Sequence, residues 1–136
     1  MGRHKKPTHP LDMKNGQYDE CFGTSAEYVR ALKTVIGHRV HPRHLEMLLE
    51  HYRSPKHTTT WESLTGKVGY RTGNTVNTQY GTFAGRVATE LGISEKPEGF
   101  WLYVLVKWAG RKDAKGHTQF VLRKPVCEAL EQLGLV

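Results

Sequence analysis

Residues 58–91, TTTWESLTGKVGYRTGNTVNTQYGTFAGRVATEL, decide the fold that we expect for this chain. They divide into a short helix near 60–68 and a longer helix near 74–91, with Gly69 in the turn between them. One side of the longer helix is apolar at helical spacing and is formed by Val76, Tyr80, Phe83, Ala84, Val87 and Leu91. Two helices joined by such a turn predict a helix-turn-helix at about 60–91.

The other side of the longer helix is polar and has no carboxylate. It carries Thr75, Thr78, Gln79, Thr82, Arg86 and Thr89. Hydroxyls, an amide and an arginine suit base edges and phosphates, so we predict a recognition helix that enters the major groove of DNA. The base-reading residues that we expect are Thr75, Asn77, Thr78, Gln79, Thr82 and Arg86. The alternative is an ordinary amphipathic core helix whose polar side is hydrated.

The segment after this helix predicts a β-hairpin over about 101–123. FWLYVLVKW is rich in β-branched and aromatic residues, AGRKDAKG has the composition of a loop, and HTQFVLR is the returning strand. A hairpin directly after a helix-turn-helix is the winged-helix arrangement. We expect phosphate contacts from Arg111, Lys112 and Lys115 at its tip, and from Lys67 and Arg71. A solvated turn without a ligand is the alternative for the tip.

Three more helices are predicted around this unit. One runs over 25–36, where Thr24 and Glu27 have the spacing of a capping box, and the second over 42–53. The apolar stripe expected for the second is Leu45, Leu48, Leu49 and Tyr52. The last helix covers about 125–133. Thr59 and Glu62 have capping-box spacing at the start of the short helix.

The length of 136 residues suits one domain, which we place at 23–136 and expect to be mainly α with a small β-hairpin (α+β). Residues 1–22 are basic and rich in Pro and Gly, and predict a flexible arm. This arm is either a tail without a role or a segment that contacts DNA.

Charge favours a polyanionic partner. The formal net charge is +7, and the positive side chains gather in 1–14, 67–86 and 107–124. The last two segments contain the predicted recognition helix and hairpin tip. No apolar run is long enough to span a membrane and the amino terminus has no hydrophobic signal region, so we expect a cytoplasmic protein with two reduced cysteines and no membrane partner.

The tryptophans, the histidines and the lack of catalytic motifs bear on which kinds of site we expect. Trp61, Trp101 and Trp108 either pack in or near the core, or, for the first two, present an aromatic wall to a base. His41 and His44 are close in sequence but have no Cys or acidic partner, so we predict neither a metal site nor a cofactor. No catalytic motif occurs, and we expect a protein that is not an enzyme. A catalytic site that the sequence hides is the alternative.

The chain also resembles a known group of modules. HLEMLLEHYRSPKHTTTWESLTGKVGY, continued by NTVNTQYGTFAGRVATELG and WLYVLV, is similar to the winged-helix-like modules fused to HNH nuclease domains in bacterial restriction-type proteins, some of which read modified DNA. The shared features are Tyr52, Thr58 to Thr60, Gly69 with Tyr70, and Asn77, Gln79, Tyr80 and Gly81. The resemblance covers roughly residues 42–136, and this chain has no nuclease domain. It implies DNA binding that is sensitive to base methylation, with a modified-base pocket formed by Trp61, Tyr70 and Trp101.

Two functions remain open at this stage. The first is a prokaryotic or phage-type winged-helix protein that binds double-stranded DNA. The second is a protein-interaction module on the same scaffold, such as a phage-encoded inhibitor or regulator of a host protein, because a fold alone does not assign a function. If the chain has a protein partner, we expect a nuclease or a regulator. The sequence does not predict the oligomeric state.

Overall fold

The computed structural model describes residues 21–136, and most of the predicted basic arm lies outside the described residues. The described chain is α+β, as expected, with five α-helices and a three-stranded antiparallel sheet. In chain order the elements are α1 (Ser25–Gly37), α2 (Pro42–Arg53), the 3-10 helix η3 (Pro55–His57), β1 (Thr58–Thr59), α3 (Trp61–Val68), α4 (Gly73–Leu91), the 3-10 helices η4 (Pro97–Gly99) and η5 (Trp101–Val104), β2 (Val106–Lys112), β3 (Thr118–Leu122) and α5 (Lys124–Gln132).

Short polar side chains begin the first, third and fourth helices. The capping box of α1 is confirmed, since the Thr24 hydroxyl accepts from the Glu27 backbone N–H and the Glu27 carboxylate accepts from the Thr24 N–H. The cap predicted for α3 is wrong by one residue, because Thr60 accepts from the Ser63 N–H at 3.1 Å. Thr59 is unavailable as a cap because it belongs to β1.

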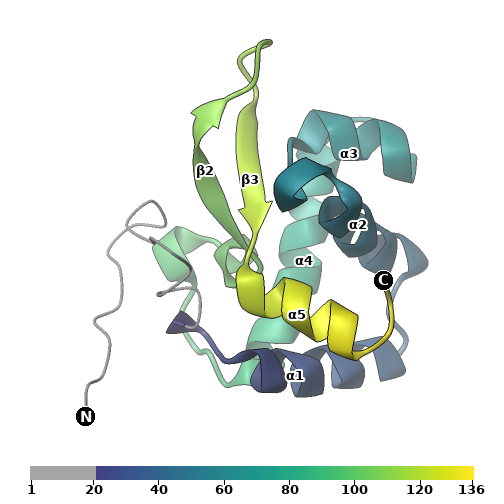
Figure 1. The fold of residues 1–136 in the computed structure, drawn as a ribbon, viewed down its shortest axis with the longest axis vertical. Helices are drawn as coiled ribbons and strands as arrows, with labels where there is room; N and C mark the ends of the chain where they lie inside the picture. Colours follow the sequence, from purple (N-terminus) through teal and green to yellow (C-terminus); the bar gives the residue numbers. More distant parts are fainter. Residues whose placement is uncertain (1–20) are drawn as a thin grey trace.

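The sheet has the order β1-β3-β2, and both outer strands run antiparallel to β3. Thr58 pairs with Val121 and Thr59 with Phe120, so the two residues before α3 join the hairpin to the helices. The sequence did not indicate β1, which has only two residues. Figure 1 shows the β2–β3 hairpin projecting past the helices at one end, with α1 and α5 together at the other end.

The hairpin is shorter than predicted, because residues 101–104 form η5 and β2 begins at Val106. A half-exposed strand would bury alternate side chains, whereas Val104, Leu105 and Val106 are all buried in succession. The Leu105 carbonyl accepts from the Arg123 N–H at 2.9 Å, which closes the base of the hairpin. The apolar run of 100–108 therefore contains a partly buried turn of helix that leads into a strand.

The core joins all five α-helices with η5 and the base of the hairpin. Tyr28 of α1 is fully buried, and its hydroxyl donates to the Val104 carbonyl of η5 at 2.5 Å. The apolar stripe predicted for α2 is rotated, and the side that faces the core is His44, Met47, Leu48 and His51. Both sets have the same helical spacing, and the set with the histidines is the buried one. His44 Nε2 and both ring nitrogens of His51 have hydrogen-bond partners inside the protein, whereas His44 Nδ1 has none among the described residues.

Candidate nucleic-acid interface

Helix α4 has the two-sided character that its sequence predicts. The Thr72 hydroxyl accepts from the Thr75 N–H at 3.1 Å, which begins the helix, and Gly92 ends it at φ 78°. The buried side chains are Val76, Tyr80, Phe83, Ala84, Val87 and Ala88. Between Gly73 and Thr89 the sequence contains no acidic residue. One long side of the helix therefore holds the fold together and leaves a polar side to be explained.

The polar side of α4 is exposed along a line of small side chains. Asn74, Thr78, Thr82 and Thr89 are exposed, and Thr75 is half-buried. The Thr82 hydroxyl donates to the Thr78 carbonyl at 3.1 Å, and the Thr89 hydroxyl donates to the Gly85 carbonyl at the same distance. These hydroxyls keep their oxygen lone pairs for an outside donor, so the line presents mainly acceptors and the Asn74 amide.

Gln79, predicted to read a base, is held inside the protein. Its Oε1 lies 2.7 Å from Nε2 of His44, a buried residue of α2. A carbonyl oxygen only accepts, so this histidine nitrogen carries the proton and donates. The bond fixes α4 against α2, and the Gln79 carbonyl is not available to a base in this arrangement.

Arg86, the only cation predicted to read a base, is also engaged internally. Its Nη2 donates to the His38 carbonyl at 2.7 Å and approaches the Val35 carbonyl at 3.5 Å. These carbonyls belong to the last turn and the end of α1, where the Val35 carbonyl also accepts from the His38 backbone N–H at 3.2 Å. The guanidinium thus caps α1, a role that the polar position of Arg86 on α4 did not indicate.

Asn77 is joined to Trp61 at the start of α4. The Trp61 Nε1–H donates to the Asn77 Oδ1 at 3.0 Å, which leaves the Asn77 amide N–H₂ to donate elsewhere. The Trp61 ring stacks on Phe120 with centroids 4.3 Å apart and meets Tyr80 edge-on at 5.5 Å. Trp61 thereby ties α3 to α4 and β3, the packing role considered for it from the sequence.

The three aromatic residues of the expected modified-base pocket do not come together. Trp101 lines a hollow of about 260 Å³ and Trp61 a different one of about 330 Å³, on two sides of Asn77. Tyr70 lines neither, and its ring lies under the Arg43 guanidinium at 5.2 Å. The structure therefore offers two separate aromatic hollows beside α4 in place of one.

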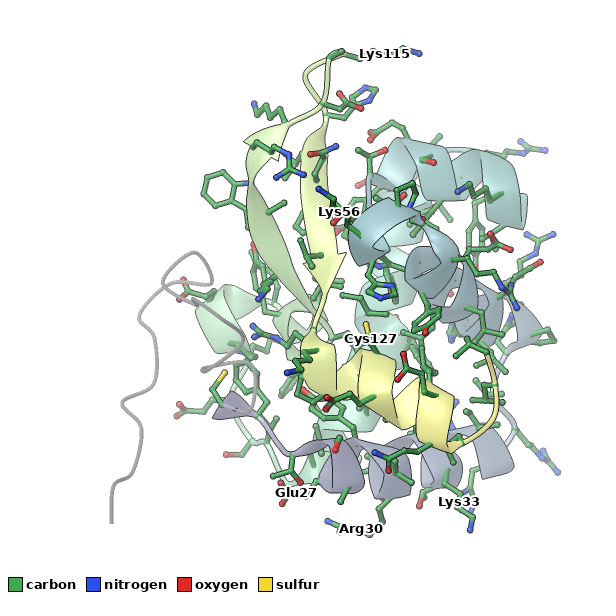
Figure 2. The ribbon with its side chains drawn as sticks, in the orientation of Figure 1. Glu27, Arg30, Lys33, Lys56, Lys115 and Cys127 are labelled. Atoms are coloured by element: carbon green, nitrogen blue, oxygen red, sulfur yellow. The ribbon has the colours of Figure 1, made fainter. Side chains whose placement is uncertain are left out.

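The hairpin tip is basic, and the Asp113 carboxylate holds its turn together through hydrogen bonds to the backbone. Arg111, Lys112 and Lys115 are exposed, and Figure 2 shows Lys115 pointing away from the end of the hairpin. The Asp113 Oδ1 accepts from the backbone N–H of His117 at 2.8 Å and of Lys115 at 2.9 Å. The His117 N–H lowers the pKa of the Asp113 carboxyl below its usual value. Lys67 and Arg71 are exposed near the start of α4.

A buried histidine links α2, α4 and β3 behind this surface. His51 has no exposed surface, its Nε2 lies 2.9 Å from the Phe120 carbonyl, and its Nδ1 lies 2.9 Å from the Tyr80 hydroxyl. The carbonyl requires a proton on Nε2, so Nδ1 accepts from Tyr80. Burial lowers the pKa of His51 to about 4, and the ring is neutral at pH 7. Sequence reasoning missed this residue, although its spacing from His44 and Leu48 is helical.

Over 21–136, no three side chains of the His, Cys, Asp or Glu types gather closely enough to hold a metal ion, and His41 lies beside His44 with ring centroids 5.2 Å apart. In the same part of the chain, each helix is too short or too polar to cross a bilayer.

Comparisons of the chain with protein-family models, with curated proteins and with solved structures found no match.

Proposed function

We propose that this protein is a winged-helix protein that binds double-stranded DNA without acting on it as an enzyme. The order α2, β1, α3, α4, β2, β3 supports the winged-helix assignment, since a hairpin follows the helix pair directly and a short strand before α3 completes its sheet. In this proposal α3 and α4 are the helix-turn-helix, and α1 and α5 are additions at the far end of the molecule, where α1 packs on α4 and α5 packs on α1.

The observation that carries the proposal is the exposed, acid-free side of α4 on the same domain as a basic hairpin tip. Threonine hydroxyls and an asparagine amide hydrogen-bond to base edges, and lysine and arginine bind phosphates. With Gln79 and Arg86 engaged inside the protein, base reading falls to Asn74, Thr78 and Thr82. Lys67, Arg71 and the cations of the tip are then the phosphate ligands.

The test begins with a selection from random duplexes, prepared with and without adenine or cytosine methylation. The selection provides a preferred site and shows whether methylation changes the preference, as the resemblance to restriction-type modules implies. Binding to the selected duplex and to a scrambled duplex is then measured by fluorescence anisotropy. The ratio of the two affinities reports base reading separately from charge attraction.

Thr78→Ala combined with Thr82→Ala is the informative variant. We expect the preference for the selected duplex to fall by about tenfold or more, since a lost base contact costs roughly 1–3 kcal/mol. Thr89→Ala is the matched control, because Thr89 has the same bond as Thr82 to a carbonyl four residues earlier but lies two turns further along α4, beyond the residues assigned to base reading. Equal preferences in the double variant, the control and the unmodified protein would contradict base reading by α4.

A further inference from the structure

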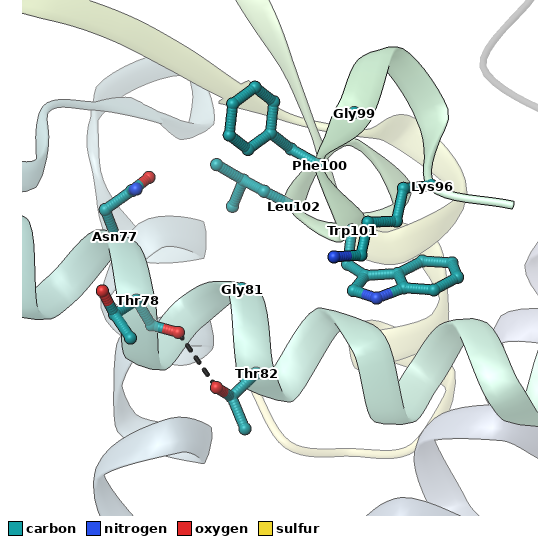
Figure 3. A pocket seen from close by; sticks show the side chains of 9 residues that line it. All are labelled: Asn77, Thr78, Gly81, Thr82, Lys96, Gly99, Phe100, Trp101 and Leu102. Carbon is teal, nitrogen blue, oxygen red and sulfur yellow. Dashed lines mark hydrogen bonds between the residues drawn. The ribbon is translucent and has the colours of Figure 1, made fainter.

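A hollow lies directly beside the exposed line of α4. It has a volume of about 260 Å³ and is open to solvent. Helix α4 contributes Asn77, Thr78, Gly81 and Thr82, and the segment through η4 and η5 contributes Lys96, Gly99, Phe100, Trp101 and Leu102. Figure 3 shows the two groups on opposite sides of the hollow, with the helix below and Phe100 and Leu102 above.

Gly81 keeps this hollow open without serving the fold. A Cβ at Gly81 meets no atom within 4 Å, whereas a Cβ at Gly85 in the next turn would come within 3.2 Å of the Trp101 ring. Glycine inside a helix costs roughly 1 kcal/mol relative to alanine. The packing of Trp101 accounts for Gly85, but nothing among the described residues accounts for Gly81. Gly37 and Gly66 have the same open space, but of these three glycines only Gly81 lines the hollow, so a group that enters it meets no side chain there.

The walls of the hollow suit a flat, uncharged, hydrogen-bonding group. Phe100 is 57% exposed, an unusual exposure for a large aromatic side chain, and its ring offers a stacking surface. The Asn77 Oδ1 is held by the Trp61 indole, so its N–H₂ group is left as a donor of fixed identity. Thr78 and Thr82 line the hollow on the side of α4.

Size and charge restrict the occupant further. The volume is below that of a site for a drug-sized ligand, which runs from about 300 Å³ upward, so a single ring system is the appropriate size. Lys96 is the one charged residue that lines the hollow. Glu95 and Glu98 are exposed on the same segment without lining it, and they oppose the entry of a phosphate but not of a neutral base.

We propose that this hollow binds one unpaired nucleobase of the DNA partner, stacked against Phe100 and hydrogen-bonded by Asn77. The inference rests on the proposed DNA binding and adds that one base leaves the duplex when the protein binds. The hollow adjoins Thr78 and Thr82, so a base displaced from the groove that these residues read has a short path into it. Aromatic stacking of this type stabilises an unpaired base whatever its sequence.

Unpairing a base from an intact duplex costs a few kcal/mol, and the cost is lowest at a mismatch. The protein should therefore bind a duplex that contains one mismatch about tenfold or more tighter than the same duplex fully paired. A mismatched 2-aminopurine in the probe should brighten on binding, because this base fluoresces weakly while it is stacked between its neighbours. Anisotropy and fluorescence intensity on the full chain give the two readouts.

Gly81→Leu fills the hollow, and Gly66→Leu is its matched control. Both glycines are helical and have no atom within 4 Å of an added Cβ, but Gly66 lies in α3 away from the hollow. We expect the mismatch preference and the fluorescence gain to disappear in Gly81→Leu and to persist in Gly66→Leu. Phe100→Ala is a second test, because it removes the stacking ring from an exposed position where loss of stability is small. Thermal melting checks that each variant folds.

The outcomes separate the two proposals. Equal binding of paired and mismatched duplexes by the unmodified protein would overturn the base-binding inference and leave DNA binding in place. Retention of the mismatch preference in folded Gly81→Leu or Phe100→Ala would also overturn it, and would point to a different use of the hollow, such as docking of a protein side chain. Failure to bind any duplex would remove both proposals together.

Discussion

Arg86 lies on the polar side of α4, yet its guanidinium donates to the His38 and Val35 carbonyls at the end of α1. We expect Arg86→Ala to lower the free energy of unfolding by about 2 kcal/mol, because hydrogen bonds from a charged group are stronger than neutral ones and the carbonyls lose their cap. Urea denaturation followed by circular dichroism measures the change.

Arg71→Ala is the contrast to this variant. Arg71 is exposed near the start of α4, where we propose a phosphate contact. Its removal should weaken DNA binding and leave the unfolding free energy within about 0.5 kcal/mol of the original value. If Arg86→Ala leaves stability unchanged and only DNA binding falls, then the base-reading role predicted from the sequence is correct and the capping role is wrong.

His51 gives the fold a pH dependence. The pKa is 6.5 in an unfolded chain and about 4 in the folded protein, so between these values the unfolded state binds more protons. Stability is therefore complete above pH 6.5 and falls as the pH decreases toward 4, by up to about 3 kcal/mol from this residue. Burial is the largest cause of the lowered pKa, and the charge of His57 adds to it, while hydrogen bonds with the Phe120 and His57 backbone raise the pKa of His51.

Urea denaturation at a series of pH values from 4 to 8 tests this linkage. His51→Gln provides the comparison, since an amide can donate and accept hydrogen bonds but does not titrate. The variant is expected to be less stable at pH 7 and to lose less stability between pH 6.5 and 4. Parallel stability profiles for the two proteins would show that another group carries the acid sensitivity.

At the residue scale, the sequence indicates which chemical groups a helix carries better than it indicates which residues those groups contact inside the protein. It indicates that α4 carries hydroxyls, amides and an arginine on one side, and the structure agrees. It does not indicate that His44 and the end of α1 take two of those side chains, because these contacts join residues 35 to 51 positions apart in the chain. Side-chain partners of this kind depend on how the helices pack and have no local signal.

At the scale of elements, helices were predicted closely and the segment around 101 was not. Caps, Pro42 and terminal glycines set the ends of α1 to α4, and each is a local feature of the sequence. Residues 100–108 combine β-branched and aromatic types that favour a strand. They form η5 first, because this segment packs on α4 and is buried on several sides at once. Composition alone does not separate these two outcomes.

The contrast between Gly81 and Gly85 is a test of that packing. Gly81→Ala should raise the unfolding free energy by about 1 kcal/mol, since the added methyl group meets no atom and alanine favours the helix. Gly85→Ala gains the same propensity but places its Cβ 3.2 Å from the Trp101 ring, so we expect no gain or a net loss. Paired urea denaturation curves measure both. Equal stabilisation by the two substitutions would mean that η5 moves away from α4 easily.

For the whole molecule, the distribution of charge decides how salt acts on binding. Lys112→Gln combined with Lys115→Gln should make the slope of log affinity against log salt shallower by about 2, if each lysine contacts one phosphate. Thermal stability should not change, because both side chains are exposed. Anisotropy titrations at several salt concentrations provide the slope.

Arg30→Gln combined with Lys33→Gln is the matched control for charge. Figure 2 shows these exposed cations on α1, at the end of the molecule opposite the hairpin tip. The variant has the same net charge as the tip variant and should keep the original slope. Similar slopes for the two variants would indicate general attraction to DNA and contradict a defined contact at the tip.

The sequence predicts the order of helices and strands more completely than it predicts the candidate site. Helices α3 and α4 and the hairpin that follows them are readable because each element has its own periodicity. The third strand escaped because Thr58 and Thr59 are too few to show alternation, and their pairing with β3 joins residues about sixty positions apart. The hollow beside Gly81 escaped for a similar reason, since its two walls come from separate segments.

That two-residue strand has a thermodynamic consequence. Because Thr58 and Thr59 pair with β3 immediately before α3 begins, the hairpin and the helix pair are held at one relative orientation before any partner arrives. Folding therefore already includes the conformational entropy cost of aligning the hairpin with the helix pair. This cost does not weaken the binding of a partner. Affinity then depends on how well the distance between the two contact sites on the partner matches the fixed distance between α4 and the hairpin.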